Sequence, residues 1–205
     1  MIAPQDWIKL VLEISKLIRE STETLLVHVC CAPCAVYPLS LLLKSQPSLT
    51  VIPWFYNPNI QPLEEFRRRR DALAYLAFSM GSLVPTLSAP LAVDFSPPYN
   101  AGRFLSLAAL DPVEPARCRS CYHLRLDMAA RTAALRGIPA FTTTLLYSRR
   151  QRHELIKEVG QEVAKEHQVK FFYQDFRKGW QEGLEMSKKL GLYRQRWCGC
   201  VYQAS

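Results

Sequence analysis

The sequence predicts a single α/β domain, a Rossmann-like (HUP-like) three-layer sandwich around a mostly parallel sheet of about five strands. Two observations support this fold class. Apolar runs of strand length alternate along the chain with segments whose apolar residues recur at helical spacing, and this alternation is typical of parallel sheets joined by right-handed crossovers. The 205 residues are 49% hydrophobic and 21% charged, which is enough apolar content for one sizeable core.

The individual elements follow from the spacing of apolar residues and from the breaks between them. Residues 1–22 are expected to form an amphipathic helix that packs on the body of a domain spanning residues 1–205. Gly81, Gly137 and Gly191 stand where glycine commonly ends a helix, and the proline-containing stretch at 88–101 reads as an irregular loop. We expect strands at residues 25–29, 49–56, 83–87, 140–146 and 170–173, and helices at residues 35–44, 63–80, 102–110, 122–135, 151–167 and 180–190.

All seven cysteines fall into three short groups. The first group follows the first strand directly, and ligands of open α/β sheets bind beyond the carboxyl ends of the strands. Cysteines that only fill a core would be scattered among the apolar elements. The charged N-terminus does not resemble a signal peptide, so we expect a cytoplasmic protein with no membrane partner, in which clustered thiols stay reduced and bind metal or do redox chemistry. The groups are Cys30, Cys31 and Cys34; Cys118 and Cys121; and Cys198 and Cys200.

The chain has no glycine-rich phosphate loop, since no glycine precedes Gly81. This argues against kinases, ATP-driven ligases and simple dehydrogenases, and in favour of metal in the crevice. One structural zinc would use four thiols and leave three unexplained. A [4Fe-4S] cluster also takes four cysteines, and the other three could then hold one further ion. Spacing favours iron–sulfur but leaves zinc open.

Five short motifs follow one another in register between residues 25 and 202. They resemble the epoxyqueuosine reductase QueH family. The resemblance implies reduction of epoxyqueuosine to queuosine at the wobble position of tRNA, with a [4Fe-4S] cluster beside a mononuclear ion, iron or zinc, and without cobalamin. The motifs are Cys-Cys-Ala-Pro-Cys at 30–34, Tyr-Asn-Pro-Asn-Ile at 56–60, Cys-Arg-Ser-Cys-Tyr-x-Leu-Arg-Leu at 118–126, Phe-Thr-Thr-Thr-Leu-Leu at 141–146, and Trp-Cys-Gly-Cys-Val-Tyr at 197–202.

The resemblance also implies which residues bind metal. Cys34 is the departure, because some relatives carry an aspartate at this position, so sulfur and oxygen both serve there. We expect the two internal groups to supply most cluster ligands, and a metal-binding tail at residues 192–205 to help hold the single ion. The other six cysteines, Cys30, Cys31, Cys118, Cys121, Cys198 and Cys200, match the family's metal-binding positions.

The implied reaction sets further requirements. Turning an epoxide into an alkene takes two electrons and two protons and releases water. The electrons must come from an external one-electron donor such as a ferredoxin or flavodoxin, and an ion with an open position can act as a Lewis acid on the epoxide oxygen. Tyr56, Tyr147 and Asp94 are candidate proton donors because they lie near predicted strand ends or loops.

The net charge of +8 predicts a polyanionic partner, which fits a tRNA carrying epoxyqueuosine. Arginines interleaved with aromatic residues near the cysteines are the best candidates, since an unpaired anticodon base can stack on such a ring. Two other functions remain open, namely another iron–sulfur tRNA-modifying enzyme of the thiolase or desulfidase type, and a non-enzymatic zinc-binding RNA-interaction module. The candidate tRNA-binding residues are Arg149, Arg150, Arg194, Arg196 and Trp197.

Overall fold

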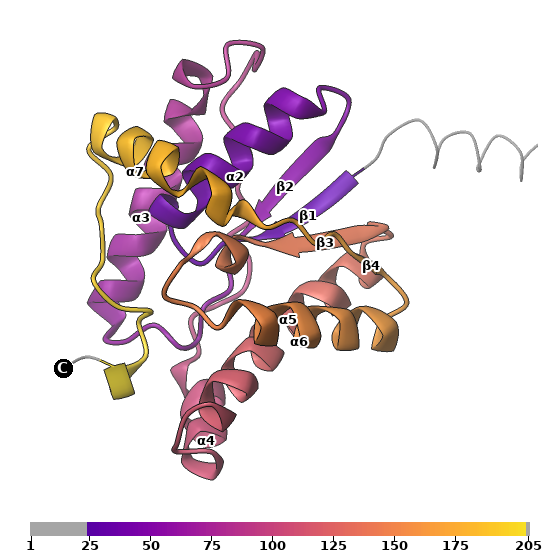
Figure 1. Ribbon diagram of the computed structural model, residues 1–205, viewed down its shortest axis with the longest axis vertical. Coiled ribbons are helices and arrows are strands. Elements are labelled where there is room, and N and C mark those ends of the chain that lie inside the picture. Colours follow the sequence, from indigo (N-terminus) through magenta and orange to yellow (C-terminus); the bar gives the residue numbers. More distant parts are fainter. Residues whose placement is uncertain (1–23, 204–205) are drawn as a thin grey trace, which may run out of the picture.

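The protein is an α/β sandwich around one parallel sheet, and the computed structural model describes its residues 24–203 (Figure 1). The predicted helix at residues 1–22 lies outside the described residues. The sheet has the strand order β2-β1-β3-β4, and every neighbouring pair is parallel. The strands are β1 (Thr24–His28), β2 (Thr50–Trp54), β3 (Ala140–Thr143) and β4 (Lys170–Phe171).

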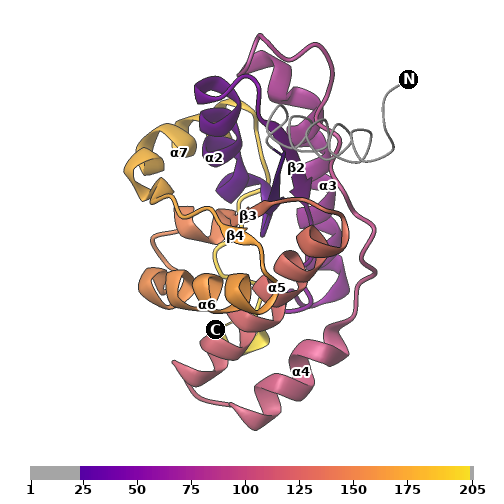
Figure 2. The same cartoon turned by 90° about the vertical axis from the view of Figure 1, so that its right-hand side faces the viewer.

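Helices cover both faces of the sheet, as the predicted three layers require. Helices α2 and α7 pack together on one face, α5 and α6 pack together on the other, and α4 lies against α5 at one end of the molecule (Figures 1 and 2). Among the described residues, no helix is long and apolar enough to cross a membrane. The helices are α2 (Ala32–Ser45), α3 (Leu63–Ser79), α4 (Ala101–Leu110), α5 (Ala116–Leu135), α6 (His153–Glu166) and α7 (Trp180–Lys189).

The central strand β1 is apolar along its length because helices bury both of its sides. Leu26 lies opposite Ile52 of β2 and Phe141 of β3, and both Leu26 and Phe141 are completely buried. The chain leaves β1 toward β2, whereas β3 lies on the other side of β1. This reversal of direction opens a crevice at the carboxyl ends of β1 and β3, where the first cysteine group follows.

The sheet has four strands where the sequence suggested about five. The predicted strand at 83–87 is wrong. A short 3-10 turn, Met80–Ser82, continues from α3, and the backbone then turns again, with the Leu87 amide donating to the Val84 carbonyl. Pro85 lies in this stretch and cannot donate a hydrogen bond to a ladder, while the apolar residues around it still pack on the core from outside the sheet.

Several predicted boundaries also shift. The fourth predicted strand ends early, because Thr144–Tyr147 forms a 3-10 turn that bends the chain over the crevice. Helix α5 begins at Ala116, so that Cys118 and Cys121 lie within its first turns. The loop at 88–101 is partly ordered by β2, since the Asp94 amide donates to the Pro53 carbonyl and thereby covers the edge of the sheet.

Candidate metal centre

The first three cysteines form a compact group at the end of β1. Cys31 is the extended residue before α2, so Cys30 lies before the helix and Cys34 lies in its first turn. Their three sulfur atoms all lie within 4.8 Å of one another, and Cys30 Sγ is 3.8 Å from Cys31 Sγ. Thr144, at the end of β3, accepts a hydrogen bond from the Cys30 amide at 3.1 Å. We call Cys30, Cys31 and Cys34 the thiol trio.

The three thiols of the trio differ in how readily they lose a proton. Hydrogen bonds from Cys31 and Cys34 hold the pKa of Cys30 well below its usual value. Burial, followed by the hydrogen bond to Cys30, raises the pKa of Cys31 to about 12. The hydrogen bonds to Cys30 and Cys31 raise the pKa of Cys34 as well. Three thiolates this close together need a cation between them, which is the environment that a metal ion supplies.

The other four cysteines surround a second cavity of about 270 Å³. Cys118 and Cys121 come from α5, and Cys198 and Cys200 come from the C-terminal tail, residues 192–203. Burial raises the pKa of Cys121 to about 11, while hydrogen bonding from Cys200 lowers the pKa of Cys198 to about 6. Phe104 of α4 is buried against Cys121 and Cys200. We call these four cysteines the thiol quartet.

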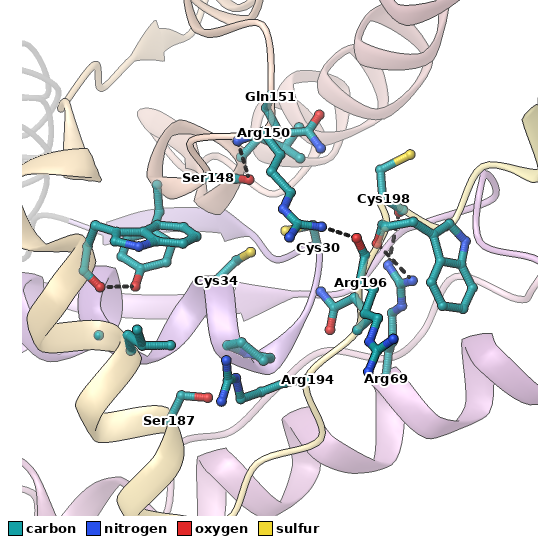
Figure 3. A pocket seen from close by; sticks show the side chains of 18 of the residues that line it. Cys30, Cys34, Arg69, Ser148, Arg150, Gln151, Ser187, Arg194, Arg196 and Cys198 are labelled. Carbon is teal, nitrogen blue, oxygen red and sulfur yellow. Dashed lines mark hydrogen bonds between the residues drawn. The ribbon is translucent and has the colours of Figure 1, made fainter. Parts of the chain in front are cut away.

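A larger cavity of about 520 Å³ adjoins the quartet, and Cys30 and Cys34 of the trio line it. Figure 3 shows Cys30 and Cys34 near its centre, with Arg150 and Arg194 on opposite sides. Cys198 lines both cavities, so the trio and the quartet belong to one continuous site. Three further residues line both cavities: Arg125, Arg150 and Gln151.

Arg125 is a buried cation between the two thiol groups. Its side chain is 2% exposed, and its Nε donates to the Cys121 carbonyl at 3.2 Å. Burial by itself would lower the pKa of Arg125, but the facing sulfurs of Cys121, Cys30 and Cys198 hold the pKa above its usual value. Arg125 is therefore placed to compensate negative charge in either cavity.

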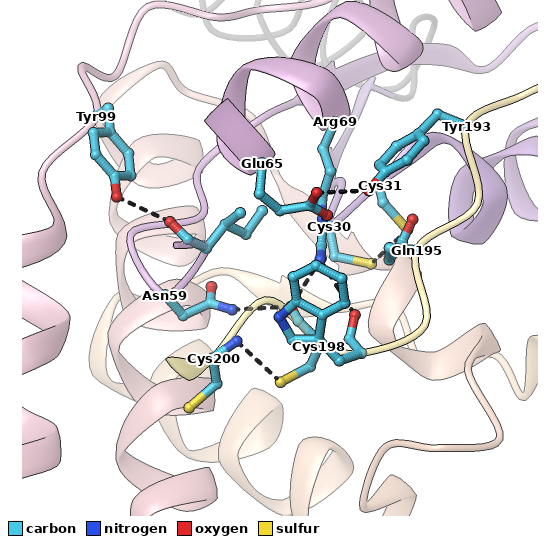
Figure 4. A network of polar contacts seen from close by, with 12 residues as sticks. Cys30, Cys31, Asn59, Glu65, Arg69, Tyr99, Tyr193, Gln195, Cys198 and Cys200 are labelled. Carbon is cyan, nitrogen blue, oxygen red and sulfur yellow. Dashed lines mark hydrogen bonds and ion pairs between the residues drawn. The ribbon is translucent and has the colours of Figure 1, made fainter. Parts of the chain in front are cut away.

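A buried ion pair on α3 holds the tail over the site (Figure 4). Arg69 Nε contacts Glu65 Oε1 at 2.6 Å, and the same guanidinium donates to the carbonyls of Cys198 at 2.9 Å and Trp197 at 3.3 Å. Tyr193 donates its hydroxyl to the other carboxylate oxygen of Glu65 at 2.6 Å. Glu65 and Arg69 therefore bind the tail as well as each other.

Gly199 lets the tail approach the body of the protein between the two cysteines that flank it. Its φ is +103°, and an added Cβ would lie 2.8 Å from Ile60 Cγ1 and 3.0 Å from Ile60 Cα. The Gly199 carbonyl accepts a hydrogen bond from the Gln61 amide at 2.9 Å. The Cys-Gly-Cys order therefore follows from a backbone that no larger residue adopts without strain.

Replacing Gly199 with alanine is expected to loosen the tail by about 2 kcal/mol, because the new methyl group is both strained and too close to Ile60. Limited proteolysis of the metal-free protein measures this as faster cleavage within residues 192–203. Gly191→Ala is a useful control, because Gly191 also has a positive φ of 62° but has open space around its Cβ position. Equal cleavage rates for the two variants would contradict the role given to the Ile60 contact.

Comparison with known proteins identifies the family. Residues 25–205 match the family described as epoxyqueuosine reductase QueH. The chain belongs to the QueH family. It is 37% identical over 184 residues to the epoxyqueuosine reductase QueH of Thermotoga maritima, covering 87% of this chain and 89% of that protein. The QueH proteins of Dehalococcoides mccartyi and Streptococcus pyogenes are 34% and 33% identical, and the matches cover 91% and 70% of their lengths.

The sequence-based expectation put most cluster ligands in the two internal groups and gave Cys198 and Cys200 to the single ion. In the structure of this QueH-family chain, Cys198 and Cys200 share a cavity with Cys118 and Cys121, because Gly199 and Arg69 dock the tail beside α5. Which thiols hold which metal stays a prediction. The trio remains as a separate group.

Of the three proton-donor candidates in this QueH-family chain, the site contains Tyr147. Its ring is buried, it lines the larger cavity, and its hydroxyl donates to the Trp180 carbonyl at 3.1 Å. Burial and the nearby sulfurs raise its pKa. Tyr56 stacks on Trp54 at 5.3 Å and lines neither cavity. Asp94 also lies outside both cavities.

The contacts of Asp94 are with neighbouring parts of the fold. Partial burial favours its neutral form, but hydrogen bonds from Ser96 and the ion pair with Arg136, at 2.5 Å, hold its pKa below the usual value. An ionised carboxylate in an ion pair is a poor proton donor. The loop position that suggested Asp94 from sequence reflects its pairing along β2.

The predicted tRNA-binding arginines surround the larger cavity. Arg150, Arg194, Arg196 and Trp197 line it, and Arg150 donates a hydrogen bond to the Arg196 carbonyl. Arg149 is exposed next to this wall, with its guanidinium 5.5 Å from the centre of the Trp180 ring. A basic rim therefore surrounds the cavity that Cys30 and Cys34 of the trio line.

Sequence reasoning missed several residues of the QueH-family site. Arg125 had a signal, because it lies four residues after Cys121 on the same helix face. Arg69 lies in the run of arginines at 67–70, and the sequence does not distinguish it from its neighbours, although it is the buried member of the run. Gln195 gave no signal, although its Nε2 donates to Cys31 Sγ at 2.7 Å. His28 gave none either.

His28 ties three strand ends together beneath the trio. Its Nε2 donates to the Tyr56 carbonyl at 3.0 Å, and its Nδ1 accepts from the Thr143 hydroxyl at 2.8 Å. Burial lowers its pKa to about 4, so the ring is neutral near pH 7. His28 therefore fixes the backbone from which the cysteines project.

Proposed function

We propose that this chain is a cytoplasmic epoxyqueuosine reductase that converts epoxyqueuosine to queuosine in tRNA. In this proposal the thiol quartet holds a [4Fe-4S] cluster, the thiol trio holds a single ion, iron or zinc, and no cobalamin takes part. The observation that carries the proposal is the placement of four thiols around one cavity and of Cys30 and Cys34 of the trio around the adjoining cavity, with Cys198 lining both. Membership in the QueH family supports the reaction class.

The spacing of the trio suits one ion. Tetrahedral metal–sulfur bonds of about 2.3 Å place neighbouring sulfurs about 3.8 Å apart. Cys30 Sγ and Cys31 Sγ are separated by 3.8 Å, and Cys34 Sγ lies within 4.8 Å of both. Three protein ligands leave a fourth position for substrate, as in catalytic metal sites.

The quartet suits a larger group. Two of its cysteines come from α5 and two from the tail, and together they surround a cavity of about 270 Å³. Cys121 and Cys200 are buried beneath α4, and Arg125 supplies a positive charge. Burial, nearby charge and hydrogen bonds are the features by which proteins set the reduction potential of a cluster. Such a cluster would supply single electrons.

The chain's own residues would bind and position the modified base. Arg150, Arg194 and Arg196 provide positive charge for phosphates, and Trp197 and Trp180 supply rings in the wall of the larger cavity. The tail separates this cavity from solvent along one side through its contacts with α3. The nucleotide would enter from the basic rim, with its epoxide toward the trio.

The reaction consumes two electrons and two protons and releases one molecule of water. Tyr147 is positioned to hold one of these protons, since its raised pKa keeps its hydroxyl protonated near neutral pH. That hydroxyl donates to the Trp180 carbonyl in the structure, and rotation toward the cavity would redirect it. Substituting phenylalanine removes only the hydroxyl and leaves the ring packing against Trp180 intact.

Anaerobic purification followed by turnover tests the proposal. The protein should be brown, contain about five irons or about four irons and one zinc per chain, and contain acid-labile sulfide. It should convert epoxyqueuosine in tRNA to queuosine with dithionite as reductant, as measured by mass spectrometry of the digested nucleosides. A colourless zinc protein that binds tRNA without turnover would favour the RNA-interaction module, and iron–sulfur content with loss or gain of sulfur in the nucleoside would favour the thiolase or desulfidase class.

The trio assignment predicts different outcomes for two substitutions at Cys34. Cys34→Asp should retain the single ion and part of the activity, because a carboxylate oxygen can ligate iron or zinc. Cys34→Ala should weaken ion binding by more than about 100-fold, since a methyl group cannot replace a ligand. Metal analysis after dialysis against a chelator measures both variants. Equal loss of the ion from the two variants would remove Cys34 from the ligand set.

A further inference from the structure

An exposed apolar surface lies directly outside the thiol quartet. Leu110 ends α4 and is 79% exposed, and Val113 in the following turn is 69% exposed. Val201 and Tyr202 of the tail are 42% and 45% exposed. Clusters of large exposed apolar side chains often mark interaction sites. We call Leu110, Val113, Val201 and Tyr202 the α4 patch.

Direct contacts join the parts of the α4 patch. The Arg117 amide donates to the Val113 carbonyl at 2.9 Å, and the guanidinium of Arg117 lies 4.7 Å from the centre of the Tyr202 ring. Helix α4 stands at the end of the molecule, and neither view shows another element of residues 24–203 on its outer side (Figures 1 and 2). The patch is therefore one surface built from α4, its connection to α5, and the tail.

The α4 patch is also next to the quartet. Phe104 and Ala108, on the inner face of α4, pack against Cys121 and Cys200. Val113 lies one helical turn before Arg117, which precedes Cys118 directly, and Val201 follows Cys200. A protein docked on Leu110, Val113 and Val201 would approach the quartet from outside the larger cavity, whose wall Tyr202 also lines.

We propose that the α4 patch is the docking surface for a small acidic one-electron carrier protein. This inference rests on the proposed function, which requires two electrons per turnover from outside the chain; two carriers are each oxidised by one electron while one epoxide is reduced and two protons are taken up. The base-binding side of the site is the basic rim of the larger cavity, which the patch meets at Tyr202, so tRNA and the carrier would bind at adjoining places.

Charge supports an acidic partner. The chain has a net charge of +8, which favours association with an acidic protein over long range. Residues 101–120 contain three arginines and two acidic residues. Arg117 pairs with Glu114 at 3.1 Å, and Arg119 pairs with Glu158 at 2.7 Å and Glu162 at 2.6 Å. The long-range attraction therefore comes from the net charge of the chain, and the patch itself supplies apolar contact area.

Acidic substitutions on the patch test the proposal. Leu110→Glu and Val113→Glu in the fully loaded protein should each weaken binding of a purified bacterial ferredoxin by at least about 10-fold in calorimetry, because they bury a like charge against it. Oxidation of reduced ferredoxin in a stopped-flow mixer should slow by the same factor. Turnover with dithionite and the affinity for tRNA should stay as in the parent protein. Phe78→Glu is the matched control, because Phe78 is 73% exposed on α3, away from the quartet.

Each contrary outcome overturns the inference. Unchanged ferredoxin binding in both variants would exclude the patch. Loss of tRNA affinity in the same variants would assign the patch to tRNA, and a parent protein of dimeric mass in solution that becomes monomeric in these variants would assign it to a second copy of this chain. Failure of the parent protein to turn over with dithionite would count against the proposed function, and the ferredoxin titration would still decide the docking surface.

Discussion

Cys121→Ala is expected to remove the cluster and abolish turnover while the fold persists. Cys121 is 8% exposed, lies in the second turn of α5, and shares its cavity with the other quartet cysteines. Iron content should fall by about four per chain, since a cluster of this type needs four cysteine ligands. Circular dichroism should stay unchanged, because Cys121 packs in a small cluster beneath α4, apart from the main core.

Cys31→Ala is the matched comparison, because it removes one thiol of the trio. This variant should keep the cluster and its absorption but lose the single ion, and it should also be inactive. Together the two variants separate the quartet from the trio by metal analysis alone. Loss of about four irons in Cys31→Ala, with retention in Cys121→Ala, would reverse the assignment, and loss of about four irons in both variants would restore the grouping expected from sequence.

Arg125→Met is expected to lower turnover by about 10- to 100-fold without unfolding the protein, in line with other residues that lie behind metal ligands. Arg125 is 2% exposed and faces Cys121, Cys30 and Cys198. Without its charge, adding an electron to the site costs more, so the midpoint potential should become more negative. Potentiometric titration followed by electron paramagnetic resonance measures this shift.

The stability of the metal-free protein distinguishes two effects of Arg125→Met, namely the loss of charge and the change in packing. Methionine matches the aliphatic part of the arginine side chain and is apolar, and replacing a buried charge by an apolar side chain is often neutral or stabilising. Urea denaturation of metal-free Arg125→Met should therefore give a midpoint at or above that of the parent. Arg117→Met serves as a control, since Arg117 is also buried and lines only the quartet cavity, where Glu114 already compensates its charge. An unchanged potential in Arg125→Met would refute the compensating role.

Local patterns in the sequence were sufficient for most of the fold. Alternation of strand-like and helical spacing located the strands β1, β2, β3 and β4 and the six described helices, and the position of Cys30 at the end of β1 located the crevice. The strand predicted at 83–87 does not form, because its apolar residues pack on the core without pairing with another strand. Whether an apolar run joins a sheet depends on free edges elsewhere, and the loop at 88–101 already occupies the edge beside β2.

The grouping of the cysteines depends on contacts between residues far apart in the chain. Cys121 and Cys200 meet because Glu65 and Arg69 of α3 hold the tail and because Gly199 fits over Ile60. These interactions join segments separated by more than a hundred residues, and no local spacing reports them. The chemistry was visible in residue types, whereas its division between two cavities needed the tertiary structure.

The four cysteines of the quartet come from two segments that are far apart in the chain, so they are synthesised at different times. Cys118 and Cys121 leave the ribosome well before Cys198 and Cys200, whereas the three cysteines of the trio emerge together near the start of the sheet. Domains fold as their residues emerge, so the sheet and the trio can form while the quartet is still incomplete. The larger metal group can then be inserted only after the tail has been translated and docked. Cells that make this protein faster than they supply iron and sulfide would therefore accumulate a folded chain with an open tail, and protease sensitivity at residues 192–203 would report that pool.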